Sequence, residues 1–148
     1  PRVCLPPTLS AVFPVATREP FQEVVAFVRR RRFDRLGPFS FSPEPGTPAA
    51  GLDGQLPDHV RQKRRDRLLA VQQEIAFAWN RAQVGRRLDV ILDAAVPDQP
   101  GAFVGRSYAD APEVDGVVYA SGEHLAIGQI VPCEIVGARG YDLVAAAL

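Results

Sequence analysis

The residues best suited to binding chemistry lie in one short segment, GRSYADAPEVDG, which spans residues 105–116. It combines one cation and three carboxylates with a tyrosine, and such a set attracts cationic polypeptides and repels phosphate groups. We therefore take five residues as candidates for substrate contact: Arg106, Tyr108, Asp110, Glu113 and Asp115. The alternative is a solvated connection in which Gly105, Pro112 and Gly116 only shape turns.

Cysteine and histidine, the residue types of most metal and nucleophilic sites, are sparse in this chain. There are two cysteines, Cys4 and Cys133, and two histidines, His59 and His124. The cysteines are far apart and in no CxxC spacing, and neither histidine lies near a cysteine or the other histidine in sequence. The sequence therefore predicts no zinc site and no disulfide framework. We assign no catalytic residue, no metal ligand and no cofactor-binding residue.

The net charge of zero hides an uneven distribution along the chain. Residues 1–80 carry 12 Lys and Arg against 8 Asp and Glu, a net charge of +4. Residues 81–148 carry 5 against 9, a net charge of −4. This asymmetry indicates two structural units with different partners.

Residues 17–32 are predicted to form an amphipathic helix. Thr17 can cap its start, and four arginines at 29–32 lie at its C-terminal end, where cations interact favourably with the helix macrodipole. Its apolar residues follow the i, i+3, i+4, i+7 spacing: Phe21, Val24, Val25 and Val28. The segment 35–42 alternates weakly and is predicted to be a short strand, which Pro38 confines to an edge or a bulge.

Residues 42–58 are rich in proline and glycine and are predicted to be a loop. A helix, a strand and a loop at the strand's C-terminal end form half of an α/β repeat, and in α/β barrels this end carries the active site. Three residues are candidates to line the mouth of such a barrel: Ser42, Gly46 and Thr47. The alternative, that they only carry the chain away from the strand, stays equally open.

Residues 58–80 give the clearest helix prediction. Asp58 can cap the helix, and its apolar residues lie along one stripe: Leu68, Val71, Ile75, Ala78 and Trp79. Trp79 is expected to anchor the helix to the β-domain that follows. The basic cluster RQKRRDR at 61–67 occupies the other side. We interpret it as a solvated face, with contact to nucleic-acid phosphates as the alternative.

Residues 81–148 are predicted to be a β-domain. LDVIL at 88–92 alternates with the period of two that is typical of a half-buried strand. Four more short strands follow at turn-punctuated intervals: AFVGRSY, GVVYA, QIVPCEIVG and DLVAAA. Five such strands predict a small closed antiparallel barrel, like an OB-fold. The predicted fold class is therefore α+β, with a partial α/β unit in 1–57, a connecting helix in 58–80 and the barrel in 81–148.

Three segments resemble the C-terminal portion of the radical-SAM methylthiotransferases. They are the pattern FP..T...F at Phe13, Pro14, Thr17 and Phe21, the loop SPEPGTPAA at 42–50, and RLLAVQQEIAFAWNRAQVGRRLDVILD at 67–93. The resemblance covers residues 13–148. It implies that residues 1–57 are a remnant of the radical-SAM α/β barrel and that 81–148 form a TRAM domain. The family has a glycine and a glutamate where this chain has Val15 and Ala16, and residues 1–12 match nothing in it.

The segment 105–116 resembles the protein-modifying, RimO-type branch of this MiaB-like family, which adds a methylthio group to an aspartate of a small-subunit ribosomal protein. The tRNA-modifying branch carries an asparagine- and arginine-containing sequence at this place. The resemblance thus implies a basic ribosomal protein as substrate. The charge of residues 81–148 favours the same partner, because phosphate binding depends on Lys and Arg. A tRNA bound through the arginine-rich helix stays as an alternative, as does a non-catalytic gene remnant.

The resemblance further implies that a full-length family member holds two 4Fe-4S clusters and uses S-adenosylmethionine. Each cluster needs three thiolates, one set in a CxxxCxxC motif, and neither cysteine here lies in that motif. We therefore expect this chain to bind no cofactor and to be inactive alone, with the catalytic residues upstream of residue 1 or missing. No stretch approaches the roughly 18–20 apolar residues of a membrane span, and residues 1–13 lack the order of a secretory signal. We expect a cytoplasmic protein without membrane contact.

Overall fold

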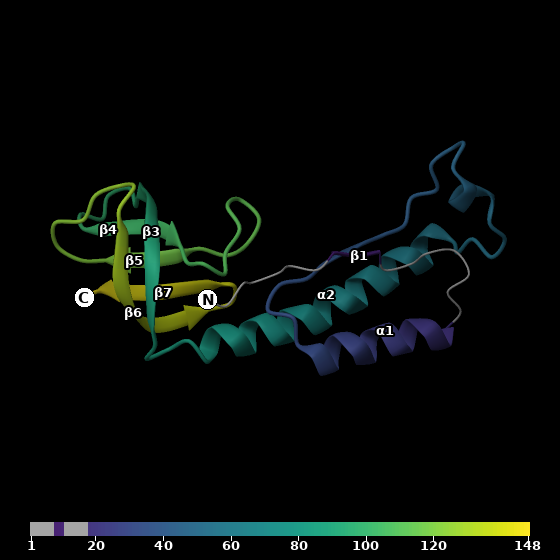
Figure 1. Cartoon of the computed structure of the whole chain (residues 1–148), viewed down its shortest axis with the longest axis horizontal. Coiled ribbons are helices and arrows are strands. Elements are labelled where there is room, and N and C mark those ends of the chain that lie inside the picture. The colour runs from purple at the N-terminus through teal and green to yellow at the C-terminus, as the bar shows by residue number, and fades with distance from the viewer. Residues whose placement is uncertain (1–7, 11–17) are drawn as a thin grey trace. The chain divides into compact units, whose positions relative to one another are not determined.

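The computed structural model describes residues 8–10 and 18–148 (Figure 1). The chain divides into two compact units, and the boundary within the long second helix falls between Ala76 and Phe77. We call the described residues up to Ala76 the helical unit and those from Phe77 onward the barrel unit. The residues Cys4, Phe13, Pro14, Val15, Ala16 and Thr17, on which several sequence predictions depend, lie outside the described residues.

The helical unit contains two helices, a short 3-10 helix and a small sheet. Its elements are β1 (Thr8–Ser10), α1 (Arg18–Arg31), β2 (Gly37–Phe39), η1 (Pro48–Gly51) and α2 (Asp58–Arg81), the last of which continues into the barrel unit. Both predicted helices are thus confirmed over their described residues. Helix α1 ends where Arg32 takes a left-handed backbone conformation, with a φ of 50°.

The predicted strand at 35–42 is confirmed over its central residues, as β2. It pairs in parallel with β1, so that Leu9 lies opposite Pro38. Proline has no backbone amide hydrogen to donate, which suits a strand of such a small sheet. Strand β1 was not predicted, because three residues are too few to show an alternating pattern.

The core of the helical unit forms where α1 and the segment after it pack against α2. Its buried residues are Val28, Leu36, Leu68, Val71 and Ile75. The side-chain amide of Gln72 on α2 donates hydrogen bonds to the carbonyl oxygens of Phe33 and Asp34, at 3.0 and 3.2 Å. These bonds give partners to backbone carbonyls of the segment that follows α1 and hold this segment against α2. The stripe of apolar residues predicted for α1 therefore faces the part of the α2 stripe formed by Leu68, Val71 and Ile75.

The barrel unit contains a closed five-stranded barrel, as predicted. Its strands are β3 (Arg87–Ala95), β4 (Ala102–Arg106), β5 (Val118–Ser121), β6 (Ile130–Arg139) and β7 (Asp142–Ala147), in the order β3-β4-β5-β7-β6. Four of the five pairings are antiparallel, and β5 pairs with β7 in parallel. Strand directions can alternate around a closed ring only if the number of strands is even. A ring of five must therefore contain a parallel pair.

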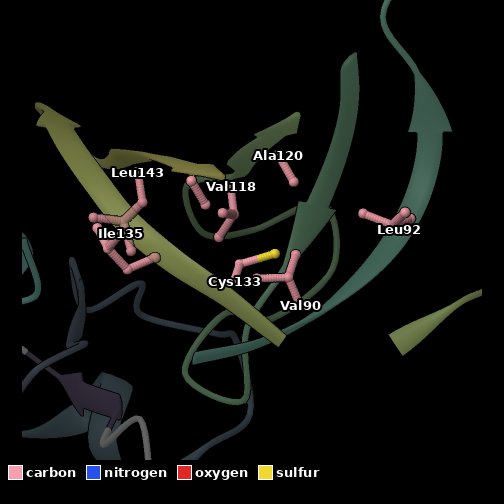
Figure 2. Packing of buried hydrophobic residues seen from close by; sticks show 8 residues of the cluster. Val90, Leu92, Val118, Ala120, Cys133, Ile135 and Leu143 are labelled. Atoms are coloured by element: carbon pink, nitrogen blue, oxygen red, sulfur yellow. The ribbon is translucent and has the colours of Figure 1, made fainter. Parts of the chain in front are cut away.

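Alternate residues of the strands fill the barrel interior (Figure 2). The buried cluster consists of Val90, Leu92, Val118, Ala120, Cys133, Ile135, Leu143 and Ala145. Burial of each larger aliphatic side chain among them contributes about 1.5–3 kcal/mol to folding. Burial also raises the pKa of the Cys133 thiol, and the carboxylate of Asp89 raises it further. Cys133 is thus a core residue held as the neutral thiol.

The last turn of α2 is fixed to the barrel within the barrel unit. Trp79 packs against the barrel core, which confirms the anchor role predicted for it. The buried side chain of Asn80 donates a hydrogen bond of 2.9 Å to the carbonyl oxygen of Gly140 in the turn between β6 and β7. The rings of Phe77 and Tyr141 meet edge to face, with centroids 4.9 Å apart. No helix in the described residues is long and apolar enough to cross a membrane.

Candidate functional site

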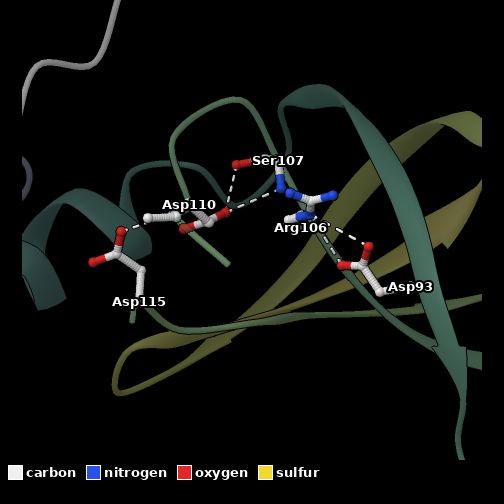
Figure 3. Close-up of polar contacts among 6 residues, drawn as sticks. Asp93, Arg106, Ser107, Asp110 and Asp115 are labelled. Carbon is white, nitrogen blue, oxygen red and sulfur yellow. Dashed lines mark hydrogen bonds and ion pairs between the residues drawn. The ribbon is translucent and has the colours of Figure 1, made fainter. Parts of the chain in front are cut away.

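The candidate contact residues lie at the end of β4 and in the connection from β4 to β5. We call residues 107–116 of this connection the acidic loop. Asp110 shapes the start of the acidic loop. One oxygen of its carboxylate accepts hydrogen bonds from the backbone amide of Ser107, at 3.1 Å, and from the Ser107 hydroxyl, at 2.6 Å (Figure 3). The Ser107 hydroxyl oxygen in turn accepts the backbone amide of Ala109 at 3.3 Å. This is a tight turn stabilised by side chains, of the kind that Ser and Asp favour.

A second carboxylate and a close backbone contact shape the other end of the acidic loop. Asp115 accepts a hydrogen bond of 2.8 Å from the backbone amide of Ala111 (Figure 3). Gly116 passes so close to the carbonyl oxygen of Tyr141 that a Cβ atom at this position would overlap it. Next to it, the backbone amide of Val117 donates to Asp142 at 3.0 Å. The acidic loop is therefore ordered at both ends by its own side chains and by the barrel.

Arg106, the cation of the segment, forms an ion pair with Asp93 on β3. Its Nε donates to both carboxylate oxygens, at 3.2 and 3.3 Å, and both side chains are partly exposed (Figure 3). An exposed pair of this kind stabilises the fold by about 1 kcal/mol or less. Its main effect is to fix the direction of the Arg106 side chain just before the acidic loop begins.

The side chains that project from the acidic loop are Tyr108, Glu113 and Val114. Tyr108 is 53% exposed and Val114 is 81% exposed. Glu113 is also exposed and has a φ of 62°, a left-handed conformation that is uncommon for a residue with a side chain. The loop thus presents an aromatic ring, a carboxylate and an aliphatic side chain to solvent. Such a set is suited to contact with a partner surface.

The structure therefore separates the five candidates by their surroundings. Arg106, Asp110 and Asp115 make hydrogen bonds within the chain, whereas Tyr108 and Glu113 are exposed. Contact of any of the five with a substrate stays a prediction. Asp93, Ser107 and Val114 belong to the same site and were not singled out from the sequence. The spacing of Ser107 and Asp110 is a turn pattern that the sequence does contain.

The three candidates for a barrel mouth are exposed in the helical unit. Thr47 caps η1, because its hydroxyl oxygen accepts the backbone amide of Ala50 at 3.3 Å and donates to the carbonyl of Glu44 at 2.8 Å. Gly46 has a φ of 84°, which favours glycine. Ser42 lies between β2 and this turn. These roles are local, and a role at a barrel mouth stays a prediction.

The acidic side chains of this site raise the question of a bound metal ion. No group of three or more His, Cys, Asp or Glu side chains in this part of the chain is arranged to hold a metal ion. The acidic loop carries three carboxylates, but two of them are committed to backbone amides and, for Asp110, a hydroxyl. The charge of this region is nevertheless strongly negative, since residues 84–148 contain 4 Arg and no Lys against 9 Asp and Glu, a net charge of −5.

Known proteins are similar to this chain over the barrel unit and over almost its whole length. Residues 84–148 match the TRAM domain family. Over 97% of its length the chain is 44% identical to the ribosomal protein uS12 methylthiotransferase RimO of Anaeromyxobacter sp. (strain Fw109-5), and 46% identical to the protein of that name from Desulfitobacterium hafniense (strain Y51). Over 88% of its length it is 50% identical to that of Synechococcus sp. (strain JA-2-3B'a(2-13)). The chain spans 31%, 32% and 27% of these relatives, less than a third of their length.

Proposed function

Because this chain belongs to the family of RimO-type methylthiotransferases, whose C-terminal part with its TRAM domain it matches, we propose that it is the substrate-recognition part of such an enzyme. The reaction proposed for the whole enzyme is the addition of a methylthio group to an aspartate of the small-subunit ribosomal protein uS12. On this proposal, residues 1–57 belong to the radical-SAM barrel, 58–80 connect it to the TRAM domain, and 81–148 recognise the substrate.

The observation that carries this proposal is the ordered acidic loop on a barrel of net charge −5. A negatively charged surface attracts a basic ribosomal protein and accelerates its association. The same surface repels RNA, whose binding depends on Lys and Arg that neutralise the phosphates. We propose that Tyr108 and Glu113 contact the substrate directly, and that Arg106, Asp110 and Asp115 hold the acidic loop in the shape that presents them.

The cofactors of the proposed enzyme do not fit the described residues of this chain. A cluster ligand must be a thiolate, whereas Cys133 is buried in the barrel core with a raised pKa. No step of the sulfur chemistry is therefore assigned to these residues. The two 4Fe-4S clusters and S-adenosylmethionine belong, on this proposal, to the rest of the enzyme. On the same proposal, the mouth of the radical-SAM barrel is bordered by Ser42, Gly46 and Thr47. We also propose a cytoplasmic location, because the proposed substrate is a ribosomal protein.

Binding of tRNA through the arginine-rich segment 61–67 is the less favoured alternative. Arg61 pairs with Asp58 at 3.4 Å, and Arg65 pairs with Asp66 at 2.8 Å. The guanidinium of Arg64 lies 5.0 Å from the ring centroid of Phe21. Three of the cations in this segment thus already interact within the helical unit, which leaves them less available to phosphate groups.

A titration of the 148-residue chain with purified uS12 and, separately, with tRNA tests the proposed function. We expect uS12 to bind, to bind more weakly as salt is added, and to bind more weakly to Glu113→Lys. A matched Glu123→Lys variant, which makes the same charge change in the turn between β5 and β6, controls for net charge. Tight and steeply salt-dependent tRNA binding without uS12 binding would contradict the proposal.

A further inference from the structure

The outer surface of strands β3 and β6 carries large aliphatic side chains that have no role in the barrel core. Ile91 on β3 lies opposite Ile130 on β6, and two residues along β3 on the same face Asp89 lies opposite Pro132. These residues alternate with Val90, Leu92 and Cys133, which point into the barrel, so their side chains face outward. We call Asp89, Ile91, Ile130 and Pro132, together with Ile127 in the turn before β6, the β3–β6 face.

The two exposed isoleucines of this face are among the most exposed large apolar residues described. Ile130 is 69% exposed and Ile127 is 62% exposed. A single exposed aliphatic residue needs no explanation, but two within four residues, next to a third across the strand pair, form a small apolar surface. Exposed apolar surfaces bordered by polar groups occur at sites where another protein binds.

Backbone hydrogen bonds fix the turn that carries Ile127. The amide of Gly128 donates to the carbonyl of Leu92 at 2.7 Å, and the amide of Leu92 donates to the carbonyl of Gln129 at 2.9 Å. The side-chain oxygen of Gln129 accepts the amide of Ala126 at 2.9 Å. Ile127 is therefore presented by an ordered turn, and a partner that binds there does not first have to order it.

Carboxylates border this apolar surface and connect it to the acidic loop. Asp89 is exposed beside Pro132, and Asp93 lies further along β3. Arg106, opposite Ile91 in the pairing of β3 with β4, forms the ion pair with Asp93 and is followed directly by the acidic loop. A partner segment that contacts the loop can thus continue over Ile91 and Ile130. Given the net charge of −5, that segment would carry cations together with aliphatic residues.

We propose that the β3–β6 face is a docking surface for a cationic, aliphatic segment of the protein substrate. This inference rests on the proposed function and extends it, since it adds a second contact area and specifies the chemistry of the segment that binds there. The aliphatic side chains of the segment lie against Ile127 and Ile130, and its cations lie near Asp89.

The double variant Ile127→Ser with Ile130→Ser in the full chain tests the docking surface. Both residues are exposed, so the thermal midpoint should stay close to that of the unsubstituted chain. We expect the dissociation constant for uS12 to rise about tenfold, as for the loss of an apolar contact at an interface. The matched control, Val136→Ser with Val144→Ser, replaces two exposed valines on β6 and β7. An equal effect of the two double variants, or no effect of the first, overturns the inference.

Two synthetic peptides, one alternating Arg with Leu and one alternating Arg with Ser, separate this inference from the proposed function. In one outcome, uS12 does not bind, whereas the Arg-Leu peptide binds more tightly than the Arg-Ser peptide and loses this advantage with the Ile127/Ile130 variant. This outcome supports the docking surface and shows that uS12 is the wrong partner. Binding of uS12 that is insensitive to the variant leaves the function standing and overturns the surface. If uS12 and both peptides fail to bind, both are overturned.

A second copy of this chain is the competing occupant of the β3–β6 face. Sedimentation velocity of the chain and of the Ile127/Ile130 variant distinguishes it. A dimer that the double substitution converts to a monomer would show that the face joins two copies and would overturn its assignment to the substrate. A monomer in both cases agrees with the inference.

Discussion

Asp110 holds Ser107 through a single carboxylate oxygen, which accepts the backbone amide at 3.1 Å and the hydroxyl at 2.6 Å. Asp110, which the sequence predicts to contact a partner, therefore also shapes the loop that carries it. The same is true of Asp115, whose carboxylate accepts the amide of Ala111. Substitutions of these two residues should change loop order as well as binding, whereas substitutions of Tyr108 and Glu113 should change binding alone.

Replacing Asp110 with alanine should loosen the start of the acidic loop. The variant loses two hydrogen bonds to a carboxylate, and we expect the free energy of unfolding to fall by about 1–3 kcal/mol. Urea unfolding measures this loss, and hydrogen exchange should show faster exchange of the Ser107 amide. Glu113→Ala, at an exposed position of the same loop, is the control and should change stability by no more than about 0.5 kcal/mol. Equal stability of both variants would show that the Ser107 bonds do not order the loop.

Replacing Gly105 with alanine should strain the pairing of β3 with β4. A Cβ atom at this position would overlap the carbonyl oxygen of Ile91 and would lie 2.9 Å from a methyl group of Val90. We expect the free energy of unfolding to fall by about 1–3 kcal/mol, as for overpacked positions in a core. In the control, Gly137→Ala, the nearest atom is the Cβ of Val144 at 3.6 Å, an ordinary contact. The prediction fails if the two variants have the same thermal midpoint.

Replacing Asn80 with alanine should release the last turn of α2 from the barrel. The substitution removes the buried side-chain amide that donates to the carbonyl oxygen of Gly140, at a cost of about 0.5–1.5 kcal/mol in the free energy of unfolding. Gln73→Ala, at an exposed position of the same helix, is the control. Near-ultraviolet circular dichroism should also report a changed environment of Trp79, which packs against the barrel core. An unchanged Trp79 signal together with unchanged stability would contradict this role of Asn80.

Burial of Cys133 predicts a loss of stability at alkaline pH. Its pKa in the folded chain is raised above the usual value of 9.0, first by burial and then by Asp89. Below that value the thiol is protonated in both the folded and the unfolded chain, so its contribution to stability is fully present. As the pH rises above 9.0, the unfolded thiol loses its proton before the folded one, and the free energy of unfolding falls.

Urea unfolding at a series of alkaline pH values, in a Cys4→Ser background, measures this effect. The decline should be smaller in a further Cys133→Ala variant, which has no thiol to titrate. Alkylation of Cys133 by iodoacetamide should be much slower in the folded chain than in urea. Equal alkylation rates in the two states would show that the thiol is accessible and would remove the basis of the prediction.

Most of the fold follows from local patterns in the sequence. The period of two in β3 and β6 identifies the barrel strands, because Val90, Leu92, Cys133 and Ile135 must all reach one interior. Helix α1 follows from its apolar spacing and its C-terminal arginines. The patterns do not show which strands pair with one another. The parallel pairing of β5 with β7 arises because a closed barrel of five strands must contain a parallel pair. Strand β1 is a strand only through its pairing with β2.

The sequence predicts where the candidate site lies, but it does not predict the role of each residue in it. Composition identifies the acidic loop, but the partners of Asp110 and Arg106 depend on how the backbone turns. Asp93 was not found because it lies 13 residues from Arg106 and meets it only through the pairing of β3 with β4. The exposure of Val114 likewise depends on the turn that Asp115 stabilises, and an isolated valine in the sequence carries no sign of it.

The central claim is that the acidic loop contacts a protein and not RNA. Replacement of Tyr108 by the photo-crosslinking residue p-benzoylphenylalanine tests it in a mixture that contains both uS12 and tRNA, with the same replacement at the exposed Tyr119 on β5 as a control for position. Irradiation should give a covalent adduct of the chain with uS12 that is stronger from position 108 than from position 119. An adduct with tRNA from position 108 would contradict the account.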